Sequence, residues 1–118
     1  MPNQSPTLDR VFQALGDPSR LAMIERLSRG PASVSELAAP LTMSLPAVTQ
    51  HIKVLEENGL VRSQKIGRVR TCTIEPVGLT KAQRWISDRE QLWDQRLDRL
   101  GDVLAETSNH ETDGDTHG

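Results

Sequence analysis

The sequence is poor in cysteine and in aromatic residues, and these shortages exclude several classes of protein. Its 118 residues include one Cys, no Tyr and one Phe. A single cysteine cannot form a disulfide within the chain, and it cannot supply a zinc site built from several cysteines. No apolar run approaches the ~20 residues that a membrane-spanning helix needs, and the N-terminal residues lack the apolar centre of a signal peptide. We therefore expect a cytoplasmic protein with no membrane partner.

Charge is unevenly distributed along the chain, so the net charge alone does not decide whether a nucleic acid can be a partner. The 14 Lys and Arg stand against 16 Asp and Glu, and the resulting net charge of −2 argues at first against a nucleic-acid partner. All of the basic residues precede residue 102, whereas residues 102–118 hold five acids and no Lys or Arg. The remainder is therefore modestly basic, and its own charge permits binding to phosphate groups.

Length and composition predict one domain with short unstructured ends. A second domain within 118 residues would have too little core to stand alone. We expect residues 1–6 to form a disordered lead and residues 107–118 a disordered acidic tail, because both segments are polar and lack apolar periodicity. Residues 7–106 then form the folded domain.

Start and stop signals predict four short helices ahead of residue 60. Asp17 can cap a helix whose first residue is Pro18, where the missing N–H costs nothing. Ser33 and Glu36 have the spacing of a capping box. Glycines follow the first, second and fourth segments. The predicted helices cover residues 8–15, 18–29, 34–41 and 45–58.

The predicted helix of residues 45–58 has an apolar face and a polar face. Ser44 caps it, and because Pro46 has no N–H, the Ser44 hydroxyl must accept from the Ala47 N–H. Asn58 and Gly59 close the helix with a left-handed cap. We expect an apolar face of Leu45, Val48, Ile52 and Leu55, and an outward face of Pro46, Ala47, Thr49, Gln50, His51 and Lys53.

Two strands and a long helix complete the predicted domain. Strands are expected over residues 61–65 and 69–74, joined by a glycine turn, with Cys72 facing the core. A helix over residues 77–106 has apolar positions at steps of 7, 4, 3 and 4, namely Ile86, Trp93, Leu97, Leu100 and Leu104. The order α-α-α-α-β-β-α, mainly helical with a small β-hairpin, predicts a winged helix-turn-helix of the α+β class.

This architecture suits duplex DNA, whose major groove is about 12 Å wide and admits one helix. The outward face of residues 45–58 has no acid before Glu56, so phosphates would not repel its N-terminal half. Gln50 can form a bidentate pair with adenine, Thr49 can contact a base edge or a thymine methyl, and His51 can donate to a base or a phosphate. The hairpin adds three cations for contacts with phosphate or the minor groove, namely Lys65, Arg68 and Arg70.

Four stretches together resemble the ArsR/SmtB family of bacterial repressors. They are Ala14–Leu21 (ALGDPSRL), Ser35–Ala38 (SELA), Ala47–Val61 (AVTQHIKVLEENGLV) and Gly67-Arg68, and they follow the family's order and spacing over about residues 8–104. The resemblance implies a homodimeric repressor of operator DNA, with contacts from the wing around Arg68 and from Ser44, Pro46, Thr49, Gln50 and His51. It also implies a dimer interface on the first and last helices, where we expect Leu8, Val11, Phe12, Trp85, Ile86, Trp93, Leu97, Leu100 and Leu104.

The chain departs from the metal sensors of that family. Those sensors carry a Cys-x-Cys pair where this sequence has Leu37–Leu41 (LAAPL), or Asp and His on a last helix that here contains no His between residues 77 and 106. Zinc or arsenite needs three or four ligands placed together, whereas Cys72 and the three His lie on unrelated segments. The stretch Trp85–Leu100 is similar to a branch without metal sites, whose members often regulate their own operons. We expect no metal and no cofactor.

Other functions are weighed against this interpretation. An enzyme with catalytic residues is not expected, because no Ser/His/Asp set, phosphate loop or HExxH motif is present. A metal- or redox-responsive repressor of the same fold is one alternative, and a winged-helix module that binds only proteins is another. In plainer interpretations, His51 is a surface histidine and the basic hairpin is a charged edge that prevents aggregation. No effector site is evident in the sequence.

Overall fold

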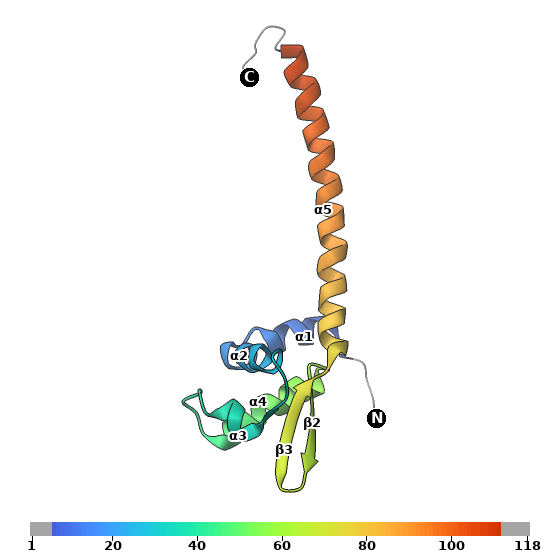
Figure 1. Cartoon of the computed structure of the whole chain (residues 1–118). Helices are drawn as coiled ribbons and strands as arrows, with labels where there is room; N and C mark the ends of the chain where they lie inside the picture. Colours follow the sequence, from blue (N-terminus) through green and yellow to red (C-terminus); the bar gives the residue numbers. More distant parts are fainter. Residues whose placement is uncertain (1–5, 112–118) are drawn as a thin grey trace. The chain divides into compact units, whose positions relative to one another are not determined.

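The computed structural model describes residues 6–111, and side chains are described for residues 6–107. The elements, which can be followed in Figure 1, are α1 (Leu8–Leu15), α2 (Pro18–Leu27), β1 (Ala32–Ser33), α3 (Val34–Ala38), α4 (Leu45–Glu57), β2 (Val61–Ile66), β3 (Val69–Ile74) and α5 (Pro76–Glu111). The predicted order of helices and hairpin strands is confirmed, with β1 added. Most of the predicted lead, and the predicted tail from residue 112, lie outside the described residues.

Capping groups define the helix boundaries much as the sequence predicts. The Asp17 carboxylate accepts from the Ser19 N–H at 2.9 Å at the start of α2. The capping box at α3 is reciprocal: the Ser33 hydroxyl accepts from the Glu36 N–H at 3.1 Å, and the Glu36 carboxylate accepts from the Ser33 N–H at 2.8 Å. The hydrogen bonds from the Ser33 backbone and side chain lower the pKa of Glu36. These bonds satisfy backbone groups that have no partner within their own helix.

The two ends of α4 also follow the prediction. At its start the Ser44 hydroxyl accepts from the Ala47 N–H at 3.3 Å. At its end Gly59 has a φ of 68°, and the Leu60 N–H reaches back to the Leu55 carbonyl at 2.9 Å. Such a cap favours glycine because a side chain is strained at positive φ.

The sheet has three antiparallel strands in the order β1-β3-β2. The hairpin pairs Val61 with Ile74 at its base and Ile66 with Val69 at its tip. The additional strand is only two residues long and pairs Ala32 with Cys72 and Ser33 with Thr71. Because Ser33 also caps α3, β1 runs directly into that helix.

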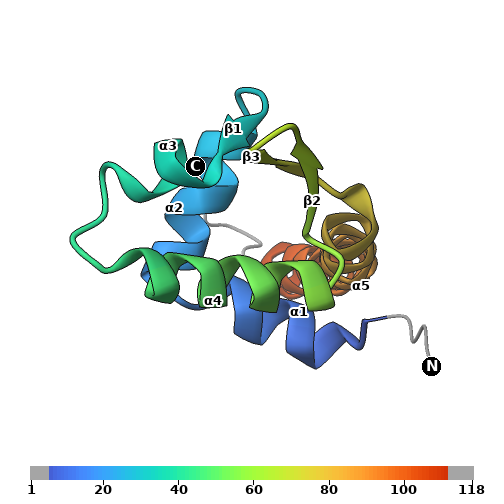
Figure 2. The same cartoon turned by 90° about the horizontal axis from the view of Figure 1, so that it is seen from below.

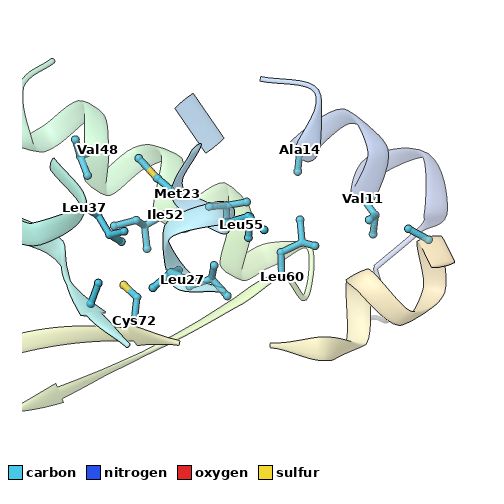
Figure 3. Packing of buried hydrophobic residues seen from close by; sticks show 14 residues of the cluster. Val11, Ala14, Met23, Leu27, Leu37, Val48, Ile52, Leu55, Leu60 and Cys72 are labelled. Carbon is cyan, nitrogen blue, oxygen red and sulfur yellow. The ribbon is translucent and has the colours of Figure 1, made fainter. Parts of the chain in front are cut away.

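One apolar core holds the helices of residues 8–57 against the sheet (Figure 3). It includes Val11, Ala14, Met23, Leu27, Leu37, Val48, Ile52, Leu55, Leu60 and Cys72. Within the core, α4 contacts α2 and α3 and also β2, and Figure 2 shows it beside α3. The expectation for Leu45 was wrong, since its side chain is 52% exposed. Leu45 begins α4, and the core covers only the later turns of that helix.

The contacts divide the chain into two compact units at Gln83 and Arg84, and α5 contributes to both. In the first unit, α5 begins tightly against the turn that follows α4. The Gly78 N–H donates to the Gly59 carbonyl at 2.7 Å, and Gly78 and Ala82 are buried. In the second unit, α5 continues to Glu111, beyond its predicted end near Glu106, so the first residues of the predicted tail are helical. Within the described residues, no helix is long and apolar enough to cross a membrane.

Candidate nucleic-acid interface

The outward side of α4 is polar and exposed along its first turns. Val48, Ile52 and Leu55 are buried, which fixes the rotation of the helix about its axis. The side chains of Pro46, Thr49, Gln50 and Lys53 are consequently exposed, at the three- and four-residue steps of one helical face. No acidic residue lies in the first turn of α4. The N-terminus of α4 therefore presents polar side chains, and the positive end of the helix dipole there favours an anion.

A groove of about 400 Å³ joins this surface to the hairpin, which we call the wing (β2 and β3). Three predicted DNA contacts line it, namely Thr49 from α4 and Arg68 and Arg70 from the wing. The sequence did not indicate its other lining residues, which are Ser33, Val34, Ser35, Leu45 and Val69. The exposure of Leu45 follows from this position, since it forms part of the wall of the groove. The predicted residues Gln50, His51 and Lys53 lie outside it.

The wing tip concentrates positive charge. Lys65 and Arg70 are direct cross-strand partners, and Arg68 lies in the turn between them. Like charges directly opposite each other destabilise a hairpin, so an anion bound between them would relieve the repulsion. Within residues 6–107, the side chains of Lys65 and Arg68 have no hydrogen-bond or ion-pair partner. These two cations are therefore available to an external anion.

Other polar groups of the wing, and the Arg70 guanidinium, form contacts within the protein. The Arg70 guanidinium donates to the Ser63 hydroxyl at 3.0 Å, and that hydroxyl donates to the Glu56 carboxylate at the end of α4. Arg62 forms an ion pair with Glu75, and its hydrogen bond lowers the pKa of Glu75. These contacts connect α4 to the wing and the two wing strands to each other.

His51 is half-buried and is held from α2. The Arg20 Nη1 lies 3.1 Å from the His51 Nδ1, while the Arg20 Nε donates to the Ala14 carbonyl at 2.7 Å. His51 thus differs from Gln50, which is exposed and has no side-chain partner among residues 6–107. No local pattern indicates this contact, because the two residues are 31 positions apart.

The predicted dimer residues differ in their exposure in the single chain. Val11 has no exposed surface and packs in the core, Leu8 is half-buried, and Phe12 is 37% exposed. On α5 the predicted residues are 42–65% exposed, namely Trp85, Ile86, Trp93, Leu97, Leu100 and Leu104. Trp85 is also stacked under the Arg89 guanidinium, 4.8 Å from its ring centre. A run of large apolar side chains with this exposure is typical of a surface that binds another protein.

Among the residues whose side chains are described, Cys72 and His51 do not belong to a cluster of metal ligands. Cys72 is fully buried. Its burial, and to a lesser extent the nearby charge of Glu56, raise the pKa of its thiol. The described residues contain no group of three or more His, Cys, Asp or Glu that could hold a metal ion. His110 and His117 lie outside the residues whose side chains are described.

A short helix, a turn, an exposed polar helix and a cationic hairpin on the same side of a small core define a winged helix-turn-helix, a class that binds duplex DNA. Residues 15–64 match the family model described as a helix-turn-helix domain. Over 89 residues the chain is 42% identical to the HTH-type transcriptional regulator Rv2034 of Mycobacterium tuberculosis (strain ATCC 25618 / H37Rv), covering 75% of this chain and 80% of that one.

Solved structures agree with the sequence relatives. The structure of the ArsR family transcriptional regulator RHA00566 matches this chain with a TM-score of 0.70 and a sequence identity of 47%, and the match covers 77% of this chain and 97% of that chain. An ArsR-like transcriptional regulator from Rhodococcus sp. RHA1 has a TM-score of 0.68 and 33% identity, over 81% of this chain and 91% of that chain. The protein therefore belongs to the ArsR family of transcriptional regulators, which bind DNA and are not enzymes.

A third structure shares the fold at lower identity. It is the homodimeric winged helix-turn-helix DNA-binding domain Mb0332 of Mycobacterium bovis, a possible ArsR-family regulator. The TM-score is 0.55 and the identity 23%, over 78% of this chain and 82% of that one.

Proposed function

We propose that the protein is a homodimeric repressor that binds an inverted-repeat operator overlapping a promoter and so excludes the polymerase. The observation that carries this proposal is the groove that is lined both by Thr49 of α4 and by Arg68 and Arg70 of the wing. Such a groove engages a base edge and the neighbouring phosphates of one stretch of duplex together. Affinity and sequence selection then come from the same surface.

Each predicted contact has a role that follows from its chemistry. Gln50 and Thr49 read base edges in the major groove, Gln50 by a bidentate pair with adenine. Ser44, Pro46 and Lys53 face the sugar-phosphate backbone beside the helix. The wing binds phosphate through its three cations, Lys65, Arg68 and Arg70. Two copies related by a two-fold axis would place two α4 helices about 34 Å apart, one helical turn of DNA.

The phosphate role is tested by the salt dependence of binding. Each phosphate contact contributes about 0.9 to the slope of log affinity against log salt, and a symmetric dimer has two copies of each contact. Arg68→Ala should therefore reduce the slope by about 2 on operator and on unrelated duplexes alike. The control is Arg29→Ala, which removes an exposed arginine that does not line the groove. An unchanged slope in Arg68→Ala, or an equal loss in both variants, contradicts the assignment.

The base-reading role is tested by sequence preference. A bidentate pair discriminates against the wrong base by about 1–3 kcal/mol. Gln50→Ala should therefore lower the preference for the operator over a random duplex by about tenfold or more while leaving the salt slope unchanged. Duplexes selected from a random pool by the unmodified protein supply the operator. If Gln50→Ala selects the same sequences with the same preference, Gln50 does not read a base.

The dimer is proposed to form through a second copy of this chain along α5. The apolar stripe (Ile86, Trp93, Leu97, Leu100 and Leu104) follows steps of 7, 4, 3 and 4, and these side chains are 44–65% exposed in the single chain. Spacing of this kind suits a seam between two helices. Leu8, Phe12 and Trp85 are proposed to extend the interface, and the homodimeric state of the Mycobacterium bovis domain supports the pairing. Val11 adds no surface to it, since the core covers its side chain.

Light scattering with two matched variants tests this pairing. Leu97→Asp places a charge on the apolar stripe, whereas Gln95→Asp places the same side chain on the other side of α5. Leu97→Asp should give the mass of a monomer, while Gln95→Asp should keep that of the unmodified dimer. An intact dimer in Leu97→Asp, or a monomeric unmodified protein, contradicts the proposal.

We also propose that the protein belongs to a branch of the family without metal sites. The absence of a metal-ligand cluster among the described residues and the burial of Cys72 support this. Zinc should then leave operator affinity unchanged. A zinc-dependent release of the operator would instead favour the metal-responsive alternative.

A further inference from the structure

One arginine of α2 reaches two other helices with a single guanidinium. The Arg20 Nε donates to the Ala14 carbonyl at 2.7 Å, its Nη2 to the Gln13 carbonyl at 3.5 Å, and its Nη1 lies 3.1 Å from the His51 Nδ1. The last turn of α1 has no basic residue of its own, so Arg20 supplies the cation that stabilises its carbonyl end. The planar fork allows contacts in three directions that one ammonium group cannot reproduce.

The contact determines the protonation of the histidine ring. A guanidinium carries only donors and loses no proton in a protein. The His51 Nδ1 must therefore be the acceptor, which leaves the proton of the neutral ring on Nε2. His51 also belongs to α4, next to Gln50 and two residues before Lys53. The ring is thus a hydrogen-bond donor with a defined nitrogen on the helix that enters the groove of DNA.

We propose that Arg20 is a positioning residue for DNA recognition, which holds His51 as the Nε2–H tautomer so that this N–H donates to an acceptor on the duplex. This inference rests on the proposed function. The acceptor is an oxygen or ring nitrogen, supplied either by a base edge or by a phosphate. Arg20 itself makes no ion pair with a carboxylate among residues 6–107, so its charge stays directed at the α1 carbonyls and the imidazole.

Nitrogen-15 NMR of the ring tests the positioning directly and without DNA. His51→Gln identifies the signals, because the variant lacks them. At a pH of about 8.5, the ring of the unmodified protein should show Nε2 protonated and Nδ1 bare. Arg20→Lys should shift the ring toward a mixture of both tautomers. The matched control is Arg26→Lys, since Arg26 also lies on α2 and donates to two backbone carbonyls, of Gly30 and Pro31, but makes no hydrogen bond or ion pair with α4 among residues 6–107.

The outcomes of the NMR experiment are decisive. An unmodified protein with the proton on Nδ1, or an equal mixture, overturns the proposal without any variant and so does not depend on whether Arg20→Lys folds. An unchanged tautomer in a folded Arg20→Lys protein overturns it as well. Loss of the tautomer in both the Arg20 and the Arg26 variant shows general loosening of α2 and also overturns it.

Binding to the selected operator tests the contribution to recognition. A neutral hydrogen bond contributes about 1 kcal/mol, so His51→Ala, which removes the donor, and Arg20→Lys should each weaken binding by about fivefold per half-site. Arg20→Lys should add nothing in a protein that already carries His51→Ala, whereas Arg26→Lys should leave affinity unchanged. A loss of affinity confined to the operator indicates that the acceptor is a base. An equal loss of affinity on all duplexes indicates that it is a phosphate. Additive losses overturn the proposal. Absence of duplex binding by the unmodified protein at about 50 mM salt overturns the proposed function, while the NMR result still decides the positioning of His51.

Discussion

Gly78, in the first turn of α5, gives the most direct quantitative test of the packing. A Cβ at this position would lie 2.6 Å from the Asn58 carbonyl oxygen and 2.9 Å from that of Gly59, and both are backbone atoms that close α4. It would also lie 3.0 Å from the Leu60 Cδ2. The Gly78 N–H already donates to the Gly59 carbonyl at 2.7 Å, so the two segments cannot separate without losing that bond. We therefore expect Gly78→Ala to strain the junction between α4 and α5.

The expected loss of folding free energy is the sum of two destabilising contributions, reduced by one stabilising contribution. Overpacking costs about 1–3 kcal/mol. The weakened hydrogen bond adds about 1 kcal/mol. The better helix propensity of alanine returns at most about 1 kcal/mol. The net destabilisation is about 1–3 kcal/mol, which corresponds to a fall in Tm of about 5–15 °C for a domain of this size.

Thermal unfolding followed by circular dichroism measures this change against a matched variant. Gly101→Ala makes the same substitution within α5, where a Cβ meets no atom within 4 Å. It should leave the Tm unchanged or raise it, because only the propensity gain of about 1 kcal/mol remains. A Gly78→Ala protein that melts within about 2 °C of the unmodified chain would refute the close approach of α5 to the end of α4.

Three further outcomes are expected. Ser44→Ala removes the cap of α4 and should lower the free energy of unfolding in urea by about 1 kcal/mol, whereas Ser35→Ala, which removes no cap, should not. The lowered pKa of Glu75 means that its pairing with Arg62 stabilises the fold above the ordinary glutamate value of 4.5 and is lost as the pH falls through the lowered value. The difference in Tm between the unmodified protein and Glu75→Gln should therefore shrink below pH 4.5; a constant difference would exclude the ion pair as its cause. Cys72 should resist Ellman's reagent at about pH 8 until urea unfolds the chain, because burial removes its access and raises its pKa; rapid reaction in the native state would show that β3 opens.

Local signals in the sequence predicted the boundaries of most elements. The Ser33 and Glu36 pair, the Ser44 bond to Ala47 and the left-handed Gly59 all depend on residues within a few positions of one another. Such features follow from backbone geometry and from the groups that a helix end leaves unpaired. Their physical basis is local, so a single sequence is enough to predict them.

The features that sequence reasoning missed depend on distant contacts. The strand Ala32–Ser33 is too short to show alternation, and it exists because β3 lies beside it. The third helix ends at Ala38 rather than near Leu41, since Pro40 has no N–H to continue the helix. Helical spacing placed Leu45 on the apolar side, but spacing gives only a direction around the axis. How far the neighbouring elements extend along that axis is a tertiary property.

The candidate site divides in the same way. The helical period of the apolar residues predicts which residues of α4 are exposed, and the glycine turn predicts where the cations of the wing lie. The groove lined by Thr49 and Arg68 depends instead on how α3, α4 and β3 assemble. The contact of Arg20 with His51 spans 31 positions and has no local pattern. Only the folded chain brings these two side chains together.

Ser33 occupies two structural positions at once, as the last residue of β1 and as the cap of α3. No residue separates the sheet from the helix-turn-helix, so chain length at this joint is fixed. One inserted residue would rotate α3 by about 100° relative to the strand, and with it every side chain that α3 turns toward the core. The loop at Gly30 and Pro31, which precedes the strand, has no such constraint. Relatives that differ in length, and designed insertions, should therefore accept extra residues before Ala32 and reject them between Ser33 and Val34.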